Sequence, residues 1–407
     1  MATHALEQPI AIPTDAAVAV RPRLDAIDIL RGAVMVLMAL VHTRAFFSNA
    51  RFNPEDLTQT SAALFFTRWI THFCAPVFMF TAGLGAFLWL ERGRTKGQLS
   101  RFLLTRGLWL IFLELTVSRL ALYFNFDYSF IALIVIWALG CCMMLLAALI
   151  YLPVRWLAVL TGVMIAGHNL LDRFPASQFG SFAPVWNVIH QPGIFPVGKY
   201  LVLVGYPLLP WVAVMAGGYC FGQVFLWEPR RRQHLLIRTG VALTMAFVVL
   251  RWLNIYGNPA PWSHQHSTLF TVMSFLNCTK YPPSLLFLLM TLGPALIVLG
   301  CLEQVRLRDS NPLLVFGRVP LFYYLLHLYL LHAIALLFAY VRYGNGSFLF
   351  NPVPTMGRPQ QPFPPNYGYD LWAVYLFWLL VVALSYPACL WFSRLKQRRR
   401  DRWLSYF

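Results

Sequence analysis

Residues 25–47 read DAIDILRGAVMVLMALVHTRAFF, an almost unbroken apolar run that is long enough to cross a lipid bilayer as one helix. The rest of the chain has the same character. Of its 407 residues, 59% are apolar or aromatic and only 12% are charged, about half the charged fraction of an average soluble domain. This composition excludes a soluble enzyme, a disordered protein and a disulfide scaffold. The sequence therefore predicts an all-α fold, a polytopic transmembrane helical bundle.

Ten segments have the length and hydropathy that are typical of membrane-spanning helices. They cover approximately residues 25–47, 61–90, 102–123, 129–152, 154–171, 199–227, 236–256, 281–302, 319–341 and 369–393. We expect them to form one transmembrane domain over residues 21–393. A disordered cytoplasmic tail at 1–20 precedes this domain, and a basic cytoplasmic tail at 394–407 follows it.

The distribution of basic residues predicts the orientation of the chain. The formal net charge is +17, but the basic residues lie between apolar blocks, so nucleic acid is not an expected partner. If the N-terminus is cytoplasmic, most of the 32 Lys and Arg residues fall on that side, including the clusters at 92–106, 230–238 and 394–402. An even number of spans then places both termini in the cytoplasm. The expected location is the inner (plasma) membrane, with the lipid bilayer as a partner.

Metal binding has little support in the sequence. The seven cysteines have no metal-like spacing and form no evident disulfide framework. His264 and His266 are spaced like a metal-binding pair, but no nearby residue completes a ligand set. We therefore expect no metal cofactor.

The first span carries three ionisable residues, Asp28, Arg31 and His42, on one side of the helix. This stripe extends about 21 Å from the cytoplasmic mouth towards the outer half of the bilayer. Ionisable residues inside a span are costly and commonly line a functional cavity. The alternative is that Asp28 and Arg31 form an i,i+3 pair that anchors the helix end, while His42 is an ordinary buried histidine.

The second span places Arg68 and His72 four residues apart, on one helix face. The neighbouring cation favours a neutral imidazole, which makes His72 a candidate general base towards an acceptor hydroxyl or amine. Alternatively, Arg68 extends to the outer interface and His72 packs against aromatic residues. The helix rise gives His42 and His72 overlapping depths, which allows them to line the same chamber.

Two further spans carry buried polar residues. Glu114 and Arg119 lie 140° apart on the third span, so each needs a partner from another helix. Glu114 is a candidate for orienting a histidine, with an interhelical ion pair as the alternative. On the ninth span, His327 and His332 each follow a tyrosine by one turn. This surface either lines a path for the substrate or belongs to the core, where the histidines make ordinary buried hydrogen bonds.

Several segments together resemble a known family. They are RLDAIDILRG at 23–32, RWITHFCAPVF at 68–78, YPLLPW at 206–211, TKYPPS at 279–284 and FGR at 316–318. In this order and with this hydropathy, the sequence resembles the catalytic domain of heparan-alpha-glucosaminide N-acetyltransferase and its bacterial relatives.

The resemblance implies a transmembrane N- or O-acetyltransferase that takes an acyl group from cytoplasmic acetyl-CoA. The acceptor would be a sugar or glycan on the outer face, with a buried histidine as general base or acyl carrier. The family's Asp-x-x-Arg-Gly motif falls on Asp28, Arg31 and Gly32, and its end-of-helix histidine falls on His42. Many bacterial relatives have an acidic residue before that histidine, where this chain has Val41. Glu114 is the candidate for the missing carboxylate.

Charges at the two mouths suit two substrates. Arg92, Arg94 and Arg101 in the inner loop, with neighbouring Lys96 and Arg106, are candidates for holding the phosphates of acetyl-CoA. Asp28 and Arg31 are further candidates for the acetyl-CoA site. The alternative, which is somewhat favoured for any one of the basic residues, is that they are ordinary cytoplasmic-side cations. At the outer mouth, Pro282 and Pro283 would hold Lys280 and Tyr281 over the cavity. We expect the acceptor to contact a set of residues comprising Arg68, Lys280, Tyr281, His327 and His332.

The competing hypothesis is a secondary transporter or flippase of a sugar or lipid-linked intermediate, with proton coupling through the buried histidines. Such a transporter typically contains related halves with broken helices in corresponding positions. No convincing internal repeat is found in this sequence. Whether two copies form a homodimer is left open by the sequence.

Overall fold

A computed structural model describes residues 25–351, 363–399 and 401–406. The disordered tail expected at residues 1–20 lies outside these ranges. In chain order the helices are α1 (Asp25–Phe47), α2 (Ala62–Trp69), α3 (Cys74–Leu90), α4 (Lys96–Leu113), α5 (Arg119–Tyr123), α6 (Val135–Leu149), α7 (Val154–Gly167), α8 (Ala183–Ile189), α9 (Leu208–Phe221), α10 (Pro229–Leu253), α11 (Thr268–Leu276), α12 (Leu285–Leu302), α13 (Pro312–Arg318), α14 (Pro320–Tyr343) and α15 (Leu371–Arg398). The prediction of a helical membrane protein is confirmed.

Within the described ranges, eight helical segments are long and apolar enough to cross a membrane. They are Asp25–Phe47, Ala62–Leu90, Val154–Arg173, Leu208–Leu226, Pro229–Leu253, Leu285–Leu302, Pro320–Tyr343 and Leu371–Arg398. Each of them overlaps one of the ten expected spans. The chain is therefore a multi-pass membrane protein whose lipid-facing helices contact the bilayer.

The other two expected spans are also helical, but they differ from these eight in composition or length. Residues 102–123 belong to α4 and α5, which are joined through a π-helical turn at Glu114–Ser118. Helix α4 is less apolar than the eight segments because Lys96, Arg101 and Arg106 lie within it. Residues 129–152 contain α6, which has only 15 residues. This short helix begins later than expected because residues 130–133 form a strand.

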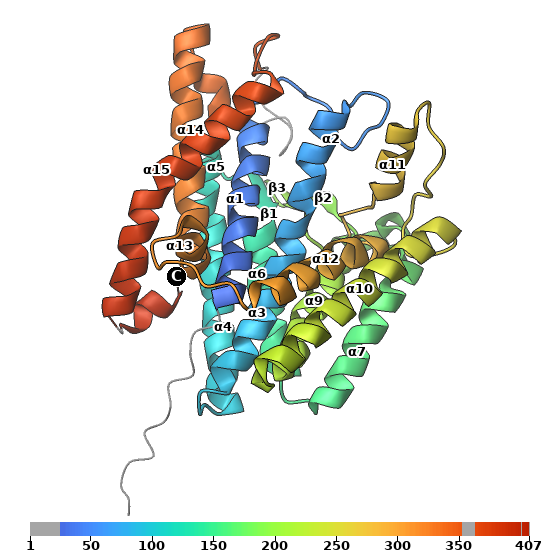
Figure 1. Cartoon of the computed structure of the whole chain (residues 1–407). Coiled ribbons are helices and arrows are strands. Elements are labelled where there is room, and N and C mark those ends of the chain that lie inside the picture. The colour runs from blue at the N-terminus through green and yellow to red at the C-terminus, as the bar shows by residue number, and fades with distance from the viewer. Residues whose placement is uncertain (1–24, 352–362, 400, 407) are drawn as a thin grey trace, which may run out of the picture.

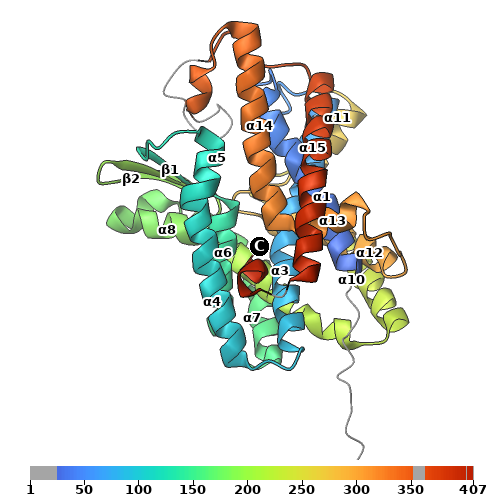
Figure 2. The ribbon, with the colours of Figure 1, turned by 90° about the vertical axis from the view of Figure 1, so that its left-hand side faces the viewer.

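A three-stranded sheet is the exception to the helical fold. It consists of β1 (Phe130–Leu133), β2 (Gly193–Val197) and β3 (Tyr200–Val204), with β3 in the middle, parallel to β1 and antiparallel to β2. The sheet and α8 project from one side of the bundle (Figure 2). The expected sixth span at 199–227 is therefore partly wrong, because its first residues form β3 and the helix begins at Leu208. Short apolar runs such as FIAL and YLVLV fit a strand as well as a helix.

Helix α1 lies inside the bundle, in contact with α3, α12, α13, α14 and α15 (Figure 1). Its crossing with α13 is very close: a Cβ on Gly32 would overlap the backbone of Leu313, and one on Gly317 would overlap the carbonyl of Asp28. By contrast, α7, α10 and α15 expose much of their apolar surface. The helix with the polar stripe is therefore surrounded by protein, and the outer helices face lipid.

Candidate active site

A hydrogen-bonded pair of histidines joins α1 to α14. His42 Nδ1 lies 2.7 Å from His327 Nε2, and the ring centroids are 5.0 Å apart. His327 Nδ1 is 2.9 Å from the carbonyl oxygen of Tyr323, one turn earlier in α14. Because a carbonyl oxygen only accepts, His327 Nδ1 carries the proton, and its Nε2 accepts a hydrogen bond from His42 Nδ1. In the neutral pair, the unprotonated nitrogen of His42 is therefore Nε2.

The two histidines differ in their exposure. His327 is fully buried, whereas His42 is only half-buried, and Tyr324 stands edge-on with its ring centroid 5.9 Å from that of His42. His327 thus lies behind His42 and fixes its tautomer, a different placement from the substrate path expected for it. His42 keeps a free lone pair on the more accessible side, as a general base requires.

A second histidine is held by a carboxylate from the loop before α2. Glu55 Oε1 accepts hydrogen bonds from His72 Nε2 at 2.8 Å and from Arg68 Nε at 2.9 Å. A carboxylate accepts only, so the unprotonated nitrogen of neutral His72 is Nδ1. This atom is buried and has no hydrogen-bond partner among the described residues. Arg68 and His72 are therefore brought together as expected, with Glu55 as their shared partner.

The segment before α12 adds two residues to this cluster, Lys280 and Tyr281. The phenol of Tyr281 interacts electrostatically with Arg68 and lies 3.3 Å from the hydroxyl of Tyr206. The buried ammonium of Lys280 interacts electrostatically with both His42 and His72. Both histidines are thus within electrostatic range of Lys280, and His42 lies near the C-terminal end of α1. We use the name outer chamber for this group of side chains, His42, Glu55, Arg68, His72, Lys280 and Tyr281.

The cations of the outer chamber lower the pKa values of its loop residues Glu55 and Tyr281. Burial alone would raise the pKa of Glu55, but Arg68 and the hydrogen bond from His72 hold it well below its usual range. Burial would likewise raise the pKa of Tyr281, yet Lys280 and Arg68 lower it. Glu55 is therefore ionised, and Tyr281 is a stronger hydrogen-bond donor than an ordinary phenol.

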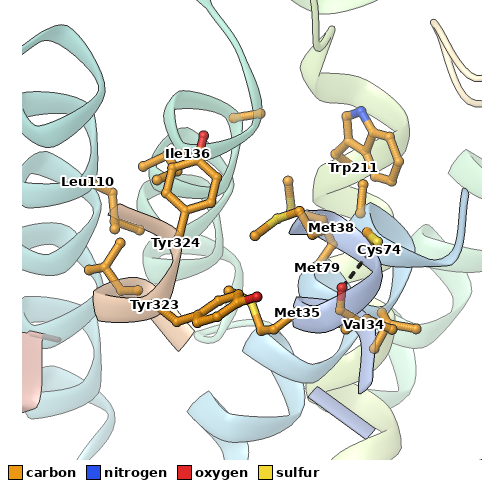
Figure 3. Close-up of a cluster of buried hydrophobic side chains, with 14 of the residues drawn as sticks. Val34, Met35, Met38, Cys74, Met79, Leu110, Ile136, Trp211, Tyr323 and Tyr324 are labelled. Atoms are coloured by element: carbon orange, nitrogen blue, oxygen red, sulfur yellow. Dashed lines mark hydrogen bonds between the residues drawn. The ribbon is translucent and has the colours of Figure 1, made fainter. Parts of the chain in front are cut away.

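A cavity of about 320 Å³, which we call the inner cavity, lies next to Tyr324, whose ring is 5.9 Å from that of His42. Arg31 and Arg106 line it together with Trp89 and Phe102, and Met38 and Tyr324 line it towards His42. Figure 3 shows Tyr324 from α14 with other lining residues of the cavity, namely Met38, Met79, Leu110 and Ile136. The cavity is mainly apolar, with guanidinium groups among its lining residues and His42 beyond Tyr324.

The basic residues expected at the inner mouth are only partly at this cavity. Arg31 Nη2 donates to the carbonyl of Thr81 at 2.5 Å, and Arg31 Nη1 is 4.0 Å from buried Asp28, so the expected i,i+3 pair is present. Arg92, Arg94 and Arg101 are exposed and do not line the cavity, although Arg94 lies 4.0 Å over the ring of Trp89. Arg106 lines the cavity in their place.

Two other predicted residues have structural partners elsewhere. Glu114 Oε2 accepts hydrogen bonds from the backbone N–H groups of Ile136 and Trp137, so it caps the start of α6 and does not orient a histidine. His332 Nδ1 donates to the carbonyl of Ala121, and its ring stacks 3.9 Å from Phe124. These contacts tie His332 to the end of α5 and not to the outer chamber.

The sequence analysis missed Glu55 and Arg44. Glu55 is in a polar loop, where one of the chain's 15 acidic residues attracts little attention. The signal for it was the Arg68–His72 pair, which had no acidic partner on its own helix. Arg44 is buried near the outer end of α1 and interacts electrostatically with Arg68 and Glu55.

In the described part of the chain, no group of three or more His, Cys, Asp or Glu side chains is arranged to hold a metal ion. His264 packs against Trp262 and His266 against Phe270, with ring centroids 5.3 and 4.2 Å apart. The chemistry available at the outer chamber is therefore that of imidazoles, one carboxylate and several cations.

The family assignment rests on the N-terminal part of this arrangement. The model of the family "Heparan-alpha-glucosaminide N-acetyltransferase, catalytic" matches residues 23–258. This range includes His42, Glu55, Arg68 and His72, whereas His327 and Lys280 lie beyond it. No curated protein sequence matches the chain. Because the family model covers more than half of the sequence, this chain belongs to the heparan-alpha-glucosaminide N-acetyltransferase catalytic family of membrane acyltransferases.

Proposed function

We propose that this protein transfers an acetyl or other acyl group from acetyl-CoA on the cytoplasmic side to a sugar or glycan on the outer side of the inner (plasma) membrane. The observation that carries the proposal is the tautomer of His42. Its Nε2 is unprotonated, and its ring lies 5.9 Å from that of Tyr324, which lines the inner cavity. This position suits a base that has to meet both substrates.

In the proposed reaction, an acceptor hydroxyl or amine attacks the carbonyl carbon of the thioester. The new C–O or C–N bond forms as His42 Nε2 takes the acceptor's proton. The C–S bond then breaks, and CoA leaves as the thiol with the proton that the imidazole returns. His72 Nδ1 offers a second base in the same chamber. Alternatively, one histidine first carries the acyl group covalently.

The proposed orientation has ten spans and two cytoplasmic termini. The eight apolar segments are supplemented by α4–α5 and α6, which continue the alternation between the two sides. The basic starts of α4 and α10 and the basic end of α15 then face the cytoplasm. In this orientation Arg31 and Arg106 are near the cytoplasmic side, where their charge favours the phosphates of CoA.

Labelled acetyl-CoA added to inside-out vesicles tests the proposal, because these vesicles expose the cytoplasmic face. Label should appear in glycan, and His42→Ala and His72→Ala should each lower the initial rate by about 10²–10⁴-fold, the usual contribution of a general base. His234→Ala, at an exposed position at the start of α10, is the matched control and should keep the rate. Movement of unlabelled sugar across the membrane without transfer would favour a transporter instead.

A further inference from the structure

Buried arginines in this protein generally have hydrogen-bond partners. The guanidinium of Arg251 donates to the carbonyls of Phe275, Ala260, Ser274 and Asn277. That of Arg119 donates to the carbonyls of Asn125 and Asp127, and that of Arg232 pairs with Glu303. These arginines stabilise loops and helix ends, because a buried cation without partners is strongly unfavourable.

Arg44 differs from these residues. Its side chain is buried, at 6% exposure, yet Nε and Nη1 have no hydrogen-bond partner among the described residues. Its electrostatic neighbours are Arg68 and Glu55. Glu55 accepts hydrogen bonds from Arg68 and His72, and it forms neither a hydrogen bond nor an ion pair with Arg44. A buried guanidinium with two unpartnered nitrogens inside a membrane protein indicates that an anion binds next to Arg44.

Lys280 adds a second uncompensated charge. It is 6% exposed, and within the described ranges its ammonium lies 5.3 Å from the Tyr281 ring centroid with no carboxylate at ion-pair distance. Arg44, Arg68 and Lys280, which we call the outer cation cluster, thus share one carboxylate, that of Glu55. The other acidic side chains on the proposed outer side have partners of their own: Asp56 with Thr58, Asp127 with Ser129, Asp172 with His190, and Asp370 with Asn49.

We propose that the outer cation cluster is an anion-binding subsite and that the acceptor is a carboxylated or phosphorylated sugar whose charged group binds there. This inference rests on the proposed function and specifies its acceptor. Arg44 lies two positions after His42, and the helical repeat therefore places it on the opposite side of α1. Arg44 is thus an acceptor-binding residue that does not contact the reacting carbonyl, whereas Lys280 links the subsite to both histidines.

The test compares two disaccharides of the same size, cellobiose and cellobiouronate, which differ by one carboxylate. Binding is measured calorimetrically to the full-length protein in nanodiscs, without acetyl-CoA. The wild type should bind cellobiouronate at least about tenfold more tightly, since a charge-assisted hydrogen bond contributes this much. Arg44→Gln should abolish the difference and Arg44→Lys should keep part of it. Lys199→Gln, at an exposed position in the β2–β3 turn, is the control and should keep the full difference in affinity between the two disaccharides.

A second arm identifies the source of the anion. A polyprenyl phosphate in the nanodisc that displaces cellobiouronate would assign the site to a lipid-linked phosphosugar, and no displacement would assign it to a soluble acidic glycan. Equal affinity of the wild type for both disaccharides would overturn the proposal. If Arg44→Gln does not fold, Lys280→Gln replaces it, and unchanged discrimination in that folded variant would also overturn the proposal. Normal anion binding without acyl transfer would reject only the proposed function.

Discussion

Proton positions in the histidine pair determine what His42 can do. His327 Nε2 accepts from His42 because its own Nδ1 is bound to the Tyr323 carbonyl. His327→Leu removes that acceptor, and His42 then distributes its proton between both nitrogens. We expect kcat to fall by at least about tenfold, a part of the 10²–10⁴-fold that a general base contributes. The Michaelis constants for both substrates should change little.

A glutamine at the same position supplies an acceptor of similar reach, so His327→Gln should recover part of the lost kcat. Steady-state kinetics in nanodiscs, with the exposed His234→Ala as control, show whether His327 positions His42 or binds substrate. A raised Michaelis constant for the acceptor at unchanged kcat would show that His327 binds substrate and does not position His42.

Glu55 links the pH dependence of stability to the outer chamber. Its pKa is held well below the usual range by Arg68 and His72, despite burial. The ionised carboxylate therefore stabilises the folded protein above the usual carboxyl pKa, and this contribution is lost as the pH falls through the lower folded pKa. Glu55→Gln should cost about 1–3 kcal/mol at neutral pH. The gap in unfolding temperature between wild type and variant should narrow as the pH falls below about 5.

Thermal unfolding in detergent from pH 7 to pH 3 measures this gap. Glu91→Gln, at an exposed position after α3, is the control and should follow the wild type throughout. A gap for Glu55→Gln that stays constant over the whole range would mean that the carboxylate charge does not stabilise the fold.

Residues that bear chemistry on a single helix could be predicted from the sequence, but their partners could not. Periodicity indicated that Arg68 and His72 share a face, and the structure places them on one carboxylate. Glu55 comes from a loop, whose folding depends on tertiary contacts that periodicity does not report. Lys280 was expected at the outer mouth because of the two prolines that follow it, but its electrostatic contact with both histidines was not expected. The orienting role expected for Glu114 failed for the same reason, because the start of α6 competes for its carboxylate.

At the level of elements, the crossing of α1 and α13 depends on glycine. A Cβ at Gly32 would overlap the carbonyl of Leu313, a backbone atom that cannot rotate away. Gly32→Ala should therefore destabilise the protein by roughly 1–3 kcal/mol or more, as overpacking does. Gly162→Ala in α7 meets no atom within 4 Å and should be neutral or stabilise by about 0.5–1 kcal/mol. Unfolding temperatures compare the two, and equal effects would mean that α1 and α13 can separate without cost.

Long apolar elements were predictable because their length is set by the bilayer, and each of the eight apolar segments overlaps an expected span. Short elements were not. The strands β1 and β3 were assigned to spans because a run of four or five apolar residues fits either structure. The π-helical turn at Glu114–Ser118 also leaves no signature in the hydropathy.

For the whole molecule, charge is separated along the axis of α1. Arg31 and Arg106 line the inner cavity, whereas Arg44, Arg68 and Lys280 surround the outer chamber. Two cationic regions with a histidine between them suit a reaction whose two substrates arrive from opposite sides. A soluble enzyme has no need for this separation, because both substrates reach one open cleft.

This arrangement predicts that each side controls one substrate. Arg31→Gln combined with Arg106→Gln should raise the Michaelis constant for acetyl-CoA by about tenfold or more and spare that for the acceptor, because charge-assisted contacts to phosphate are lost. Lys280→Gln should do the reverse. Arg155→Gln, on the cytoplasmic side in the proposed orientation but away from the cavity, is the control. Inside-out vesicles should use added acetyl-CoA and right-side-out vesicles should not. If both variants changed the same Michaelis constant, or if both vesicle types used added acetyl-CoA equally, the substrates would share one entrance and the two-sided mechanism would be wrong.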